Sequence, residues 1–218
     1  DAMNYPIYDA YVDKVLRHFR HKDKFCSFKN DIAKCLFYDS NIPQGYGVGS
    51  SGALVAAIFE KYSLIKRNPE TISKDELKDL KVIFGQLESY FHGKSSGIDP
   101  LICFMNLPIL IESKESVDKV SIPKEELGKG AIFLIDSGMT GETGSMIQIF
   151  FEKLKNEGFR KTLKEEFIRY NNACIDAFLK KDMNPFFRNL KKLSHWAYEH
   201  FRPMIPENIF NAWKRGLD

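Results

Sequence analysis

The segment Pro43–Ala53, with the sequence PQGYGVGSSGA, decides how the fold is interpreted. Glycines stand at alternate positions in it: Gly45, Gly47 and Gly49. Such a loop can adopt positive φ and bring its backbone close to a ligand. Ser50 and Ser51 then open an apolar pattern over 50–62 that predicts a helix. Helix N-termini attract anions, so the segment is a candidate phosphate cradle, with a plain glycine turn as the alternative.

Two better-known phosphate loops do not fit this segment. A Walker A motif needs a lysine after its last glycine, and none follows Gly49. Gly47, Gly49 and Gly52 match the pattern GxGxxG, but a dinucleotide site also needs an acidic residue about 20 positions on, at the end of a strand. Glu70 falls in a loop instead, so an NAD-binding oxidoreductase is a disfavoured third interpretation.

A second segment, Glu88–Asp99, reads ESYFHGKSSGID. Glu88 lies in the last turn of a predicted helix that Ser73 and Glu76 open as a capping box. The turn that follows presents Asp99 at the start of another helix, near Ile98. Phosphoryl transfer uses one carboxylate to hold magnesium and another near the attacking hydroxyl. The alternatives for the isolated residues are a solvated helix glutamate and a helix N-cap.

The remaining pattern predicts an α+β fold. Apolar residues at helical spacing predict a helix over 8–19, and 32–38 resembles a strand. Further strands are expected at 108–111, 117–122 and 131–135. Helices are expected at 146–154, 163–178, 185–201 and 206–213.

Composition excludes several classes of function. The net charge is +3, from 32 basic and 29 acidic residues, which is too balanced to indicate nucleic acid or a membrane surface as a partner. Four cysteines occur without CxxC or zinc-site spacing: Cys26, Cys35, Cys103 and Cys174. Scattered thiols of this kind favour a cytoplasmic location. Apolar stretches are too short for a membrane span, and no signal peptide is visible.

The two segments together resemble the GHMP kinases, and in particular the mevalonate-kinase branch. Residues 43–53 are similar to the second family signature, and 88–99 are similar to the region that carries the metal-binding glutamate and catalytic aspartate. The resemblance implies a GHMP-type fold, with an N-terminal part like ribosomal protein S5 domain 2 and a helix-rich, ferredoxin-like C-terminal part. It implies an ATP-binding domain at 1–105 and a second domain at 106–218.

The resemblance also implies the roles of single residues. It assigns the nucleotide to the loop and first helical turn: Gly45, Gly47, Gly49, Ser50 and Ser51. Ser51 and Glu88 would be the Mg²⁺ ligands, and Asp99 the catalytic base. Three residues are assigned to the substrate: His92, Ser96 and Thr143. Thr143 ends a glycine-rich stretch, 136–143, which is otherwise an ordinary surface turn.

The implied reaction is phosphorylation of a small-molecule alcohol by ATP, with mevalonate as the first choice. Another GHMP kinase, acting on phosphomevalonate, homoserine or a sugar, and a non-catalytic nucleotide-binding relative are the alternatives. The expected partner is the substrate alone, without nucleic acid or membrane, and a homodimer is a further expectation.

The chain departs from the family pattern in four places. Nothing before Tyr38 resembles the first family motif, and the chain stops where the third should begin. The expectation is therefore a fold incomplete at both ends and inactive alone. Gly52 stands where alanine is usual, and Pro100 follows Asp99 where asparagine is usual, which leaves the substrate open.

Overall fold

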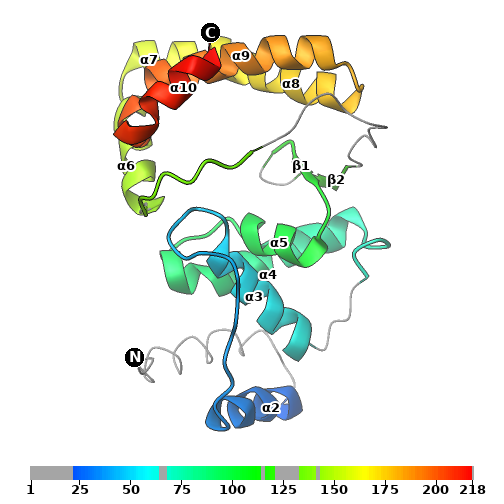
Figure 1. The fold of residues 1–218 in the computed structure, drawn as a ribbon. Helices are drawn as coiled ribbons and strands as arrows, with labels where there is room; N and C mark the ends of the chain where they lie inside the picture. Colours follow the sequence, from blue (N-terminus) through cyan, green and yellow to red (C-terminus); the bar gives the residue numbers. More distant parts are fainter. Residues whose placement is uncertain (1–21, 64–67, 114–115, 121–132, 141–142, 218) are drawn as a thin grey trace. The chain divides into compact units, whose positions relative to one another are not determined.

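The computed structural model describes residues 22–63, 68–113, 116–120, 133–140 and 143–217. The chain divides into two compact units, 1–121 and 122–218, which Figure 1 shows in blue to green and in green to red. The expected helix at 8–19 lies outside the described residues. The predicted domain boundary after residue 105 stays a prediction.

The first unit is built mainly from helices. Its described elements are α2 (Lys22–Ala33), α3 (Ser50–Tyr62), α4 (Lys74–His92), α5 (Ile98–Met105), β1 (Ile109–Ile111) and β2 (Val117–Lys119). The two strands form an antiparallel pair in which Leu110 lies opposite Asp118. This helix-rich arrangement with a small sheet confirms the predicted α+β class at that level.

Three helices bury their apolar faces against one another. Phe59 of α3 meets Phe84 of α4 edge-on, with ring centroids 4.9 Å apart, and Phe104 of α5 at 5.5 Å. Leu77 and Leu101 are also fully buried in this cluster. Apolar burial is the main stabilising term in such a core, so it fixes α3, α4 and α5 relative to one another.

The predicted boundaries of α4 are confirmed. The Ser73 hydroxyl accepts a hydrogen bond from the Glu76 backbone N–H at 3.3 Å, and the Glu76 carboxylate accepts one from the Ser73 N–H at 2.9 Å. This capping box satisfies two donors that a helix N-terminus leaves unpaired. Gly93 follows the last turn with φ 70°, a conformation that favours glycine.

The strand predicted at 32–38 is wrong. Helix α2 runs through Ala33, and the backbone N–H groups of Leu36 and Cys35 close it by binding the carbonyls of Asp31 and Ile32, with Cys35 at φ 64°. Ile32 and Leu36, four residues apart, both pack on the core. A short apolar run fits helix or strand equally well. Here Ile32 and Ala33 belong to the end of α2, and Leu36 packs on the core from the irregular segment that follows.

The other strand predictions had mixed outcomes. The strands expected at 108–111 and 117–122 correspond to β1 and to β2, which is shorter than predicted and ends at Lys119. The third, at 131–135, is not a strand over its described residues 133–135, which have no regular structure. Their side chains are exposed, and no paired neighbour among the described residues satisfies their backbone.

From Thr143 onward the second unit is built from helices. Its helices are α6 (Thr143–Leu154), α7 (Glu157–Thr162), α8 (Ile168–Leu179), α9 (Met183–His200) and α10 (Phe210–Leu217), with a π-helical turn at Leu163–Phe167 and 3-10 turns at Arg202–Met204 and Glu207–Ile209. Buried Trp196 of α9 packs its ring 4.8 Å from Phe167 and 5.7 Å from Phe159. Its indole N–H donates to Thr162 Oγ1 at 3.0 Å. The four predicted helices are thereby confirmed, with shifted ends.

Among the described helices of both units, none combines the length and apolar character that crossing a bilayer requires.

Candidate active site

The structure brings Ser51 and Glu88 together from two helices. Ser51 lies in the first turn of α3, and its hydroxyl donates to Glu88 Oε1 at 3.1 Å. Glu88 lies in the last part of α4 and is only 3% exposed. Two residues 37 positions apart in sequence therefore share one site, as the resemblance implied, although their metal-binding roles stay predictions.

Sequence reasoning missed the third member of this cluster, Ser95. Its hydroxyl donates to Glu88 Oε2 at 2.5 Å and accepts a hydrogen bond from the backbone N–H of Gly97 at 3.0 Å. The signal was the serine pair after His92-Gly93, but the family pattern directed attention to Ser96. Ser96 is exposed instead, and its hydroxyl only accepts a long hydrogen bond, 3.4 Å, from the Ile98 N–H.

Asp99 is held beside the first turn of α3 by a close contact between helices. Asp99 lies in the first turn of α5 and is exposed. A Cβ added to Gly52 would lie 2.8 Å from the carbonyl carbon of Asp99 and 2.8 Å from the nitrogen of Pro100. The two departures from the family pattern, Gly52 and Pro100, therefore meet in one contact. Only glycine at 52 permits α5 to approach α3 this closely.

The charges of both carboxylates act on the thiol of Cys103. The pKa of Cys103 is raised by its partial burial and, to a smaller extent, by the negative charges of Asp99 and Glu88. Cys103 lies four residues after Asp99, on the same face of α5. Both negative charges disfavour the thiolate form of Cys103.

The glycine loop takes the backbone conformation that its sequence predicts. Gly45, Gly47 and Gly49 have φ of 79°, 68° and 78°. Gly49 is the N-cap of α3 and provides no side-chain cap for the first helical turn. A Cβ on Gly47 or Gly49 would meet nothing within 4 Å, so the described surroundings leave space around this loop.

A cavity of about 500 Å³ adjoins the start of α3. Its lining includes Ser50 and Ser51 at the helix start, Asp39 and Gln44 on the preceding segment, and Phe91 of α4. The volume is in the range of small-molecule sites. This cavity, which contains the predicted phosphate-binding serines, is the candidate nucleotide pocket.

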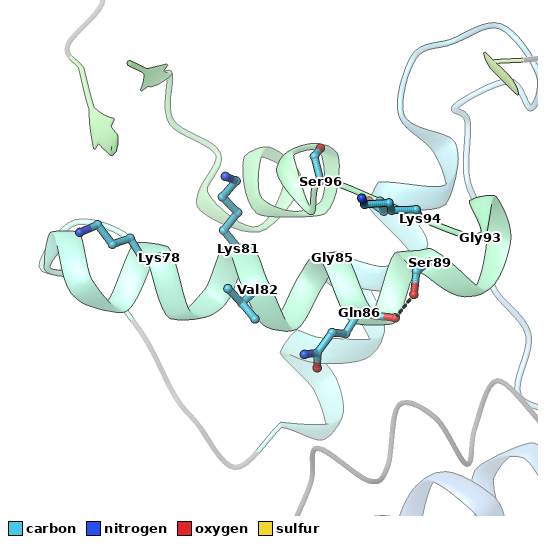
Figure 2. A pocket seen from close by; sticks show the side chains of 10 residues that line it. Lys78, Lys81, Val82, Gly85, Gln86, Ser89, Gly93, Lys94 and Ser96 are labelled. Atoms are coloured by element: carbon cyan, nitrogen blue, oxygen red, sulfur yellow. Dashed lines mark hydrogen bonds between the residues drawn. The ribbon is translucent and has the colours of Figure 1, made fainter. Parts of the chain in front are cut away.

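A second cavity, of about 480 Å³, lies along α4 and the turn after it (Figure 2). Lys78 and Lys81 stand on the helix side, and Lys94 on the turn. No carboxylate lines this cavity. Because Ser51 lines the first cavity and not this one, we place the chemistry at the first cavity.

The side chains of two predicted substrate residues, His92 and Thr143, lie outside what the structure describes. His92 is the last residue of α4, and Thr143 is the first of α6 in the second unit.

The donor set fits magnesium better than a cation that needs many protein ligands. The described residues contain no group of three or more histidine, cysteine, aspartate or glutamate side chains able to hold a metal. Mg²⁺ usually binds one or two carboxylates together with substrate phosphates and waters. Ligands about 2.1 Å from Mg²⁺ stand roughly 3 Å apart along an octahedral edge. The Ser51 Oγ to Glu88 Oε1 separation of 3.1 Å matches that spacing.

One family model matches the part of the chain that carries this site. Residues 10–106 match the family model described as the GHMP kinases N terminal domain. The match supports the predicted resemblance of this segment to the GHMP kinase superfamily. It includes the glycine loop, Ser51, Glu88 and Asp99. GHMP kinases in general use ATP and phosphorylate alcohol groups. Among curated proteins and solved structures, none matches the chain significantly.

Proposed function

We propose that this chain carries the nucleotide and metal site of a GHMP kinase that transfers the γ-phosphoryl group of ATP to an alcohol of a small anionic metabolite. Mevalonate is the substrate that we favour, because the interval of eleven residues from Glu88 to Asp99 agrees with the mevalonate-kinase branch. The proposed fold is the GHMP type, with an N-terminal part like ribosomal protein S5 domain 2 and a ferredoxin-like C-terminal part.

The buried carboxylate of Glu88 is the observation that carries the proposal. Both of its oxygens accept hydrogen bonds from serine hydroxyls, and no cationic side chain among the described residues pairs with it. A buried charge without a counterion is costly. A bound divalent cation would compensate that charge, and Ser51 beside Oε1 supplies a second oxygen ligand.

Each of the chain's own groups then has a defined task. The backbone of the Gly45–Gly49 loop and the first turn of α3 binds the nucleotide phosphates. Ser51 and Glu88 would hold Mg²⁺, which neutralises negative charge on the transferred phosphoryl group when bound. Asp99 accepts the proton of the substrate hydroxyl. Catalysis of this kind relies on positioning and electrostatics rather than on a covalent intermediate.

The proposal places the reaction in the cytosol. The described cysteines Cys35, Cys103 and Cys174 are free, which supports a reducing compartment.

A direct assay of the full-length gene product tests the function. ADP release would be measured with Mg-ATP and a panel of mevalonate, phosphomevalonate, homoserine and galactose. We expect turnover with one alcohol and highest kcat/KM for mevalonate. Turnover with another member of the panel would overturn the substrate assignment. The absence of both turnover and thermal stabilisation by Mg-ATP would overturn the proposed kinase function.

Replacement of Glu88 by glutamine is expected to raise the Mg²⁺ concentration needed for half-maximal activity. The amide removes the negative charge while keeping the shape of the side chain. Since changes to outer-shell partners of a metal cost roughly 10- to 100-fold in affinity, loss of a ligand should cost at least about tenfold. A Mg²⁺ titration of ADP formation measures the shift.

Asp79→Asn is the control for this titration. Asp79 is an exposed carboxylate on the same helix, so its removal changes net charge by the same amount without touching the site. Equal Mg²⁺ requirements for Glu88→Gln and Asp79→Asn would remove Glu88 from the metal site.

A further inference from the structure

Glu88 presents its two carboxylate oxygens to two different partners. Oε1 faces the Ser51 hydroxyl of α3 at 3.1 Å, and Oε2 accepts the Ser95 hydroxyl proton at 2.5 Å. Glu88 is 3% exposed, so water has little access to replace either contact. The carboxylate is therefore oriented, with one oxygen toward the nucleotide cavity and the other toward the turn after α4.

The direction of the Ser95 hydrogen bond follows from its second partner. A serine hydroxyl has one proton to donate and two lone pairs that accept. Because the Gly97 backbone N–H donates to Ser95 Oγ at 3.0 Å, the single proton of the hydroxyl remains for Glu88. A rotation of the Ser95 side chain away from Glu88 would lose both bonds.

The backbone around Ser95 is fixed by contact with α4 and not by a flexible side chain. A Cβ added to Gly85 of α4 would lie 3.1 Å from the carbonyl oxygen of Ser95. A Cβ on Gly97 would overlap the carbonyl oxygen of Lys81, at 2.1 Å. Two glycines thereby let the 95–97 turn pack directly on the helix that carries Glu88. The neighbouring labelled residues Gly85, Gly93 and Ser96 can be followed in Figure 2.

Occupation of Oε2 has a consequence for a cation at this site. Ca²⁺ accepts both oxygens of one carboxylate and irregular geometry, whereas Mg²⁺ requires near-octahedral ligands and binds carboxylates sparingly. A carboxylate whose second oxygen is held by a serine presents Oε1 to a cation more readily than both oxygens together. That arrangement suits Mg²⁺ and disfavours Ca²⁺.

We propose that Ser95 is a positioning residue that makes Glu88 a one-oxygen ligand and thereby favours Mg²⁺ over Ca²⁺. This inference rests on the proposed function, because it takes Glu88 to be a metal ligand. The competing explanation is that Ser95 only caps the start of α5 through the Gly97 N–H. A cap would affect stability but would not change the preference between two cations.

The test measures binding of metal and not activity. Affinities for Mg²⁺ and Ca²⁺ would be determined in the presence of ADP, by competition against Mn²⁺ followed by electron paramagnetic resonance. We expect Ser95→Ala to weaken Mg²⁺ binding by about tenfold or more, as changes to outer-shell partners do. Ca²⁺ affinity should fall less, so the ratio of Mg²⁺ to Ca²⁺ affinity falls. Ser95→Thr, which keeps the hydroxyl, should recover the ratio.

Ser89→Ala is the matched control. Ser89 follows Glu88 directly on α4, but its hydroxyl donates to the Gln86 carbonyl at 2.7 Å. Its removal should leave the ratio of affinities unchanged. If Ser95→Ala does not fold, Ser95→Cys provides the same comparison, because a thiol keeps the volume and is a weak donor.

The outcomes separate this inference from the proposed function. A wild-type protein that binds no divalent cation with ADP overturns both. Wild-type binding with an unchanged Mg²⁺ to Ca²⁺ ratio in Ser95→Ala overturns the inference alone and leaves Glu88 as a ligand. An equal loss of both affinities has the same meaning, since it indicates a general structural role.

Discussion

Replacement of Asp99 by asparagine is expected to reduce kcat by about 10²- to 10⁴-fold, the range that general-base catalysis contributes. The amide has nearly the same shape as the carboxylate, but it cannot accept the proton of the substrate hydroxyl. Asp99 lies exposed in the first turn of α5, and its backbone packs against Gly52 of α3. This backbone contact does not depend on the charge of the side chain, so the variant should keep its fold and its affinity for ADP.

Two measurements accompany this kcat. The dissociation constant for ADP with Mg²⁺ should agree with that of the wild type within about twofold, since uniform binding is unaffected when only the transition state is destabilised. Asp79→Asn, an exposed change on α4, controls for the loss of one negative charge. Near-normal kcat in Asp99→Asn would exclude Asp99 as the base. A large loss of ADP affinity would indicate a binding role.

Sequence reasoning selected this candidate site because its two segments combine several weak signals. Glycines at alternate positions predict the positive φ that Gly45, Gly47 and Gly49 adopt. The capping box at Ser73 fixes where α4 begins and therefore where Glu88 lies on it. Each feature has an ordinary structural explanation alone. Their order and spacing pointed to one family, and residues 10–106 match its N-terminal domain.

Sequence patterns could not predict the contacts between distant segments. Ser95 and Ser96 are chemically identical neighbours, and only the packing of the turn on α4 determines which of them bonds Glu88. Gly52 gave no sign that it faces Pro100, because their contact joins two helices. The strand predicted at 32–38 was wrong for a related reason, since Ile32 at the end of α2 and Leu36 after it pack on a core formed by distant residues.

Gly97→Ala is expected to destabilise the first unit by about 2–5 kcal/mol, as the sum of backbone strain and overpacking. Gly97 has φ 73°, a region that costs any residue with a Cβ. The new Cβ would also lie 2.1 Å from the carbonyl oxygen of Lys81 and 2.5 Å from the nitrogen of Gly85. Both are backbone atoms of α4, so relief requires the turn to move away, together with Ser95 and Asp99.

Gly93→Ala separates the two contributions. Gly93 has φ 70°, yet a Cβ there would meet nothing within 4 Å. This control should therefore show the strain alone, roughly 1–2 kcal/mol. Both tryptophans, Trp196 and Trp213, belong to the second unit, so their fluorescence does not follow the first. Hydrogen exchange of the α4 and α5 amides is the suitable measurement.

The same variant links stability to the site. If the 95–97 turn moves away from α4, Ser95 loses Glu88, and the Mg²⁺ requirement of Gly97→Ala should rise as that of Ser95→Ala does. Gly93→Ala should leave that requirement near the wild-type value, because the Ser95 hydrogen bonds do not involve Gly93. Equal destabilisation by the two alanines would contradict the close contact between Gly97 and α4. It would leave Ser95 without the rigid support from which its positioning role is argued.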